Sequence, residues 1–93
     1  MMVNDGDYVA IFNSIHRVMQ AEKLLKERRI PILLIPAPRT LKSDCGLALR
    51  YGGADRSAVE GSLAEGGLLP EEIFIKNGDK FVKCDVSLFE EVV

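Results

Sequence analysis

The chain is poor in the residues from which metal centres and disulfide frameworks are built. It has one histidine, His16, and two cysteines, Cys45 and Cys84, and no pair of cysteines is spaced as CxxC. A structural zinc site needs four such ligands, and two cysteines in a reducing compartment do not suggest a disulfide framework. We therefore expect neither a metal nor another bound cofactor, and the sequence directs attention to single thiols.

The chain also lacks a long apolar run and an excess of basic charge. No stretch approaches the ~20 apolar residues that span a bilayer, and the start "MMVNDGDY" has neither the basic nor the apolar part of a secretory signal. The formal charge is -2 and aromatic residues are few, so neither a basic field nor a stacking platform for nucleic acid is present. We expect a cytoplasmic protein that binds neither membranes nor nucleic acid.

The composition is that of one folded domain, residues 1–93. Apolar residues make up 47% of the chain and charged residues 28%, which is a normal globular balance, and the length leaves room for a single core. No repeat, linker or low-complexity segment divides it.

The first half of the chain predicts a strand, a helix and a second strand. Residues 8–13, "YVAIFN", form a short apolar run typical of a buried strand. Helical spacing follows over residues 14–29, with Glu22 and Lys26 placed to pair. Residues 31–36, "PILLIP", indicate a strand covered on both faces. The apolar stripe of the helix is expected to comprise Ile15, Val18, Ala21 and Leu25.

The second half predicts a strand, a helix and a hairpin. "LALRY" at residues 47–51 is the third strand. Asp55 or Ser57 can cap the next helix, and Ser57 with Glu60 has capping-box spacing; a Gly-Gly pair at 66–67 ends that helix, with Val59 and Leu63 inside. Residues 72–76 and 81–86 flank a turn, "NGDK". The tail, residues 87–93, fits either a helical turn or an extended edge.

These elements indicate an α+β protein with a ferredoxin-like β-α-β-β-α-β arrangement, a two-layer sandwich with room for an extra C-terminal strand. The rival is a thioredoxin-like or doubly wound fragment, which needs a helix between the second and third strands. The ten residues there, 37–46, include Pro38 and directly follow Pro36, and they are too few for a helix. The first two strands should run in parallel, so their carboxyl ends should lie at one edge of the sheet.

That edge is where we expect the polar residues around Cys45. The amino end of the first helix points there, and its dipole favours a thiolate, whereas the neighbouring Asp44 disfavours one. The alternative is that Cys45 is a small buried hydrophobe. Gly46 would then serve only a bulge or a positive φ, instead of allowing close approach of a cargo. The candidate site residues are Cys45, His16, Arg39, Ser14, Lys42 and Gly46.

The stretch from Phe12 to Tyr51, "FNSIHRVMQAEKLLKERRIPILLIPAPRTLKSDCGLALRY", resembles the selenium/sulfur carrier-like family of small bacterial proteins. Its most specific parts are "AEKLLK", "IPAPR" and "CGLAL" in that order, with weaker agreement over residues 55–76. The resemblance implies that Cys45 carries sulfur or selenium, with Ser14, His16 and Arg39 at matching positions. Ile15 stands where the family commonly has threonine, and Asp44 where it usually has serine.

The resemblance implies a carrier whose partner is a cysteine desulfurase or a sulfur-accepting protein, without a complete catalytic constellation of its own. A carrier needs an accessible cysteine with no resolving cysteine beside it, and Cys45 has none nearby in sequence. Cys84, in a strand-like setting, is expected to be structural. The alternative function is a non-catalytic module that binds a small ligand or pairs subunits, and exposed sheet edges make a homodimer plausible.

Overall fold

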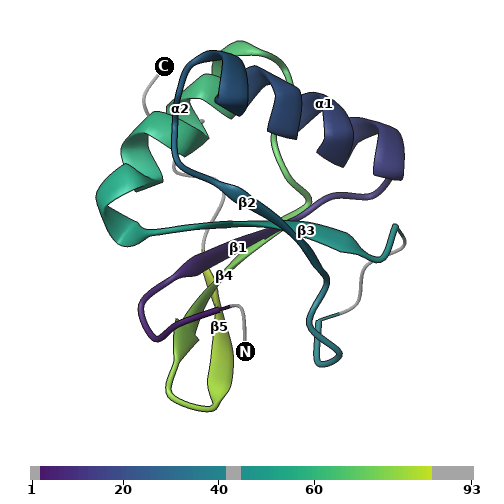
Figure 1. Ribbon diagram of the computed structural model, residues 1–93. Coiled ribbons are helices and arrows are strands. Elements are labelled where there is room, and N and C mark those ends of the chain that lie inside the picture. Colours follow the sequence, from purple (N-terminus) through teal and green to yellow (C-terminus); the bar gives the residue numbers. More distant parts are fainter. Residues whose placement is uncertain (1–2, 42–44, 85–93) are drawn as a thin grey trace.

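Strand β1 (Tyr8–Ile11) lies at the centre of a five-stranded antiparallel sheet in the computed structural model, which describes residues 3–41 and 45–84 (Figure 1). The strand order is β2-β3-β1-β4-β5. The other strands are β2 (Leu33–Pro36), β3 (Leu47–Tyr51), β4 (Glu72–Asn77) and β5 (Lys80–Cys84). In register, Ala10 lies between Leu49 of β3 and Ile73 of β4.

Two helices cover one face of this sheet (Figure 1). Helix α1 (Ile15–Glu27) begins at Ser14, whose Oγ accepts the backbone N–H of Arg17 at 3.1 Å and so caps the helix. A 3₁₀ turn, η1 (Gly53–Asp55), leads into α2 (Arg56–Glu65). Gly67, with a φ of 68°, follows α2 and reverses the chain.

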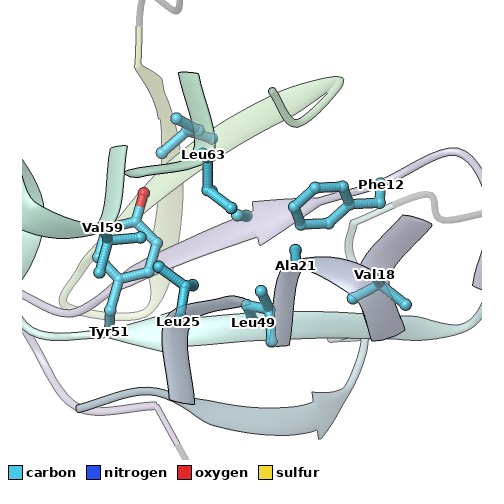
Figure 2. Packing of buried hydrophobic residues seen from close by; sticks show 10 residues of the cluster. Phe12, Val18, Ala21, Leu25, Leu49, Tyr51, Val59 and Leu63 are labelled. Atoms are coloured by element: carbon cyan, nitrogen blue, oxygen red, sulfur yellow. The ribbon is translucent and has the colours of Figure 1, made fainter. Parts of the chain in front are cut away.

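The main core lies between the helices and the sheet. Figure 2 shows side chains of both helices packed against those of β1 and β3. Alternate strand residues point to this layer, as the period of two in a strand requires. The buried members are Ala10, Phe12, Val18, Ala21, Leu25, Leu49, Tyr51, Val59, Leu63 and Ile73.

The helix-free face of the sheet has a smaller core of its own. Val9, Ile11, Ile35 and Ala48 alternate with the residues of the main core and are at most 3% exposed. Val3, near the amino end, and Leu41, in the loop after β2, pack with them. The loop that leads to Cys45 is therefore fixed to the sheet by an apolar contact.

The element order, the two helices and the α+β class agree with the prediction from sequence. β2 pairs directly with β3, which excludes the rival with a helix between them. β1 and β2 run in the same direction, since both are antiparallel to β3. The five-stranded sheet is not a standard ferredoxin-like sheet of four strands, because β5 pairs with β4 and extends it.

Two local predictions were wrong, and a third holds only in part. The expected strand at 31–36 is covered on both faces, since Leu34 packs against the main core and Ile35 lies in the smaller one, but β2 is an edge strand whose Leu33 is 39% exposed. Ile15 is 56% exposed, because at about 100° per residue it lies roughly 90° from the centre of the buried stripe. Ser57 and Glu60 form no capping box: the N-cap is Asp55, and Glu60 points into the core. The tail at 87–93 lies outside the described residues.

Candidate functional site

Cys45 lies at the junction between the β2–β3 loop and β3, half-buried against the main core. Its Sγ donates to the carbonyl oxygen of Leu47 at 3.3 Å and to that of Phe12 at 3.6 Å. Phe12 directly follows β1 and comes two residues before the cap of α1. The thiol is therefore held beneath the amino end of α1, at the sheet edge where the sequence placed it.

Gly46 gives the chain the turn that brings Cys45 to this position. Its φ is 72°, in the left-handed region that favours glycine, and its carbonyl accepts the N–H of Ala37 at 2.9 Å. A Cβ built on Gly46 would meet nothing within 4 Å. The backbone conformation, and not close approach by a neighbour, is thus the reason for glycine here.

The other candidate residues differ in burial and in the contacts that they make. Ser14 is the helix cap, and its Oγ is engaged by the N–H of Arg17. His16, in the first turn of α1, and Arg39, in the loop after β2, are both exposed. Neither side chain makes a hydrogen bond or ion pair with another residue of the described part. Lys42, and with it Asp44, lies outside the described residues.

A second polar cluster, which the sequence analysis did not find, lies under α2. Tyr51 is fully buried, and its hydroxyl donates to Oε2 of Glu60 at 2.8 Å. Arg56 donates from Nε to the same oxygen at 3.0 Å and from Nη1 to the Tyr8 hydroxyl at 3.2 Å. The two tyrosine rings stack at 5.7 Å. The i, i+4 spacing of Arg56 and Glu60 was the signal available in the sequence.

Cys84 belongs to the surroundings of this cluster. It lies at the end of β5 and packs against the main core. Burial raises the pKa of the Cys84 thiol above its usual value; the charge of Arg56 lowers it, and that of Glu60 raises it. A thiol in this setting is a poor nucleophile near neutral pH, because the thiolate is the reactive form.

We predict that iodoacetamide modifies Cys45 in the folded protein and Cys84 only slowly. The raised pKa of Cys84 leaves less thiolate near neutral pH, so its modification should accelerate at higher pH and on unfolding. Peptide mass mapping after timed alkylation, with and without denaturant, measures both rates in one sample. Equal rates at Cys84 in the folded and unfolded protein would contradict its structural assignment.

Other features of the described residues add little to the site. No group of three His, Cys, Asp or Glu side chains among them is placed to hold a metal ion. Within the same residues, no helix has the length and apolar character needed to cross a membrane. A hollow of ≈ 540 Å³ lies on the helix-free face, lined by Leu41, Phe74 and Phe81, with a polar rim that includes Lys80.

Comparison with known proteins gives one result. A family model described as "Putative Se/S carrier protein-like" matches residues 7–75, a span from β1 to β4 that includes Cys45. No curated protein and no solved structure matches the chain.

Proposed function

Because the chain belongs to the Se/S carrier protein-like family, we propose that it holds a sulfur or selenium atom on Cys45 and passes it to a partner protein. The observation that carries this proposal is the position of the thiol. Cys45 Sγ lies at a loop–strand junction against the carbonyl of Phe12, next to the amino end of a helix, and the residue is only partly buried.

Loading and release are both thiolate exchanges. The Cys45 thiolate attacks the outer sulfur of a donor persulfide; the new S–S bond forms as the old one breaks, and the donor leaves as a thiolate that takes a proton from water. An acceptor thiolate then attacks the outer sulfur and releases Cys45. Electrons balance in each step, so no external oxidant or reductant is required. The donor is proposed to be a cysteine desulfurase.

The sheet topology favours carriage over dithiol chemistry. A resolving cysteine would attack the loaded sulfur and expel the cargo as sulfide. The only other cysteine in the chain, Cys84, lies on β5. Two strands, β1 and β4, separate β5 from β3, which places the strands roughly 14 Å apart. This spacing is far beyond the reach of a disulfide.

Sγ has to change its contacts when it is loaded. The free thiol shares its one proton between the carbonyl oxygens of Leu47 and Phe12, but the inner sulfur of a persulfide has no hydrogen and loses this shared bond. The added sulfur carries the negative charge. We propose that His16, Arg39 and Lys42 stabilise that charge, while Ser14 and Gly46 hold the helix end and the loop in place.

Incubation with sodium tetrasulfide tests the proposal. The Cys84→Ser variant should gain the mass of one sulfur atom by intact mass spectrometry, and a reductant should remove it. The Cys45→Ser variant should gain none, since Cys84 is half-buried and its pKa is raised. If Cys45→Ser loads while Cys84→Ser does not, the wrong cysteine has been chosen; if neither loads, the carrier function is wrong.

The second candidate function is binding of a small, largely apolar ligand, without sulfur chemistry. The observation in its favour is the hollow of ≈ 540 Å³ beside Phe74 and Phe81, whose size is that of a ligand pocket. It lies on the helix-free face, opposite the face on which Cys45 packs. A protein that only binds a ligand would still bind it after the Cys45→Ser substitution, whereas a sulfur carrier would lose its function. This difference separates the two candidates.

A further inference from the structure

The solvent side of α1 combines exposed apolar residues with exposed lysines. Ile15 is 56% exposed and Met19 45%, and Lys23 and Lys26 follow them along the same side of the helix. Spacings of four, four and three residues bring all four side chains onto one stripe. We call this stripe, Ile15, Met19, Lys23 and Lys26, the α1 docking face.

The α1 docking face is basic in a protein that is acidic overall. Between Ile15 and Arg29 the chain has five basic residues and two acidic ones, although its formal charge is -2. Lys26 pairs with Glu22 at 3.1 Å but remains 64% exposed, and Lys23 makes no ion pair within the described part of the chain. The rest of the chain carries seven basic and twelve acidic residues, so a partner with acidic groups would find complementary charge on this face and net repulsion from the remainder.

The apolar end of this face is the end beside Cys45. Ile15 is three residues beyond Phe12, whose carbonyl oxygen is 3.6 Å from Cys45 Sγ. Figure 1 shows the start of β3 beneath the first turn of α1. The lysines lie two to three turns further on, so a bound segment would reach the thiol at one end and Lys23 and Lys26 about 12 and 16 Å further along the helix.

We propose that the α1 docking face binds an acidic partner protein and presents that partner's cysteine to Cys45. This proposal rests on the proposed carrier function and specifies the chemistry of its partner: apolar at the point of exchange and acidic two to three helical turns beyond it. A second copy of this chain does not fit, because the face has no acidic group for the lysines: a parallel pair would bring lysines against lysines, and an antiparallel pair would bring them against Ile15 and Met19.

The test uses a short peptide with a cysteine and a leucine at one end and a run of glutamates at the other, joined through its cysteine to thionitrobenzoate. In the Cys84→Ser background, the Cys45 thiolate attacks the peptide sulfur; a disulfide forms, and the coloured aromatic thiolate leaves with the electrons of the broken bond. The comparison peptide has lysines in place of the glutamates. Each rate is divided by the rate with neutral dithiodipyridine, which removes differences in thiol reactivity.

We expect the acidic peptide to react about tenfold faster than the basic one at low ionic strength, with most of the difference lost in high salt. The double variant Lys23→Glu/Lys26→Glu should reverse the preference. Lys80→Glu/Lys83→Glu is the matched control on β5: Lys83 is also 64% exposed and also pairs with a glutamate, Glu72, at 3.3 Å. This control should leave the preference unchanged.

A variant and a matched control test the apolar part of the α1 docking face. Met19→Ser should slow the acidic peptide about threefold, an amount typical of one apolar contact. Val82→Ser, at a position 48% exposed on β5, should have no effect. Equal rates for the two peptides, or equal effects of the α1 and β5 variants, would overturn the proposal. So would sedimentation showing a dimer that the α1 variants dissociate, since the face would then bind a second copy.

Failure of this proposal and failure of the carrier function give different results. The peptide assay needs only a reactive thiol at Cys45, whereas tetrasulfide loading needs no partner surface. A protein that loads sulfur but shows no peptide preference is a carrier without this docking face. A protein that shows the peptide preference but does not load sulfur would have the docking face without the carrier function.

Discussion

Replacement of Glu60 by leucine is expected to lower the free energy of unfolding by about 3 kcal/mol. Glu60 is 6% exposed, and its carboxylate accepts hydrogen bonds from both Tyr51 and Arg56. Its loss leaves a buried hydroxyl without its acceptor and a guanidinium, 29% exposed, without its counter-charge. Urea unfolding followed by circular dichroism measures the change.

Two further variants identify the cause of that loss. Tyr51→Phe alone should cost about 1 kcal/mol, because Glu60 keeps its bond to Arg56. The double variant Tyr51→Phe/Glu60→Leu should be less destabilised than the sum of the two, since the unpaired hydroxyl is gone. Glu65→Leu, which removes an exposed ion pair with Arg28, is the control and should cost under about 1 kcal/mol. Strict additivity would show that the network does not act as a unit.

High pH should destabilise the protein through Tyr51. Burial, and then the Glu60 carboxylate, raises the pKa of the Tyr51 hydroxyl far above its ordinary value. Above pH ~10 the unfolded chain releases this proton and the folded protein retains it, so stability falls as pH rises. The loss is about 1.4 kcal/mol for each pH unit above ~10, as long as the folded protein keeps the proton.

Unfolding curves over an alkaline pH series check this slope. Wild type should lose stability more steeply than Tyr51→Phe, so that the advantage of the wild type shrinks and then reverses. Tyr8→Phe retains the buried hydroxyl of Tyr51 and should retain the steep slope. A parallel pH dependence in wild type and Tyr51→Phe would contradict the role given to Tyr51.

Local sequence signals predicted the helices and strands, but not which of their faces are buried. Proline, glycine and capping residues marked the ends of α1, β3 and the β4–β5 hairpin correctly, because these signals act within a few residues. Val18, Ala21 and Leu25 were placed in the core by helical spacing alone, and the structure confirms them. The same spacing misplaced Ile15, since a periodic pattern does not show where the buried arc ends.

The sequence patterns did not predict contacts between segments that are distant along the chain. Val3 and Leu41 meet on the helix-free face, and nothing in either segment alone indicates the other. Glu60 was assigned to a cap because the pattern of nearby residues suggested one, whereas its partner is Tyr51 on β3. At the candidate site, the topology argument placed Cys45 by the amino end of α1 correctly, but whether His16 and Arg39 act on it stays a prediction.

The central place of β1 has a consequence for how the molecule forms. β1 pairs on one side with β3 and on the other with β4, and Tyr8 faces Ile75 across the second pairing. The β4 side of β1 therefore pairs only after Ile75 has left the ribosome, and loop closure over that span is slow compared with helix formation. Until β1 and β3 have paired, the carbonyl of Phe12 is not held against Sγ, and the cysteine of the nascent chain faces oxidants without the fold around it.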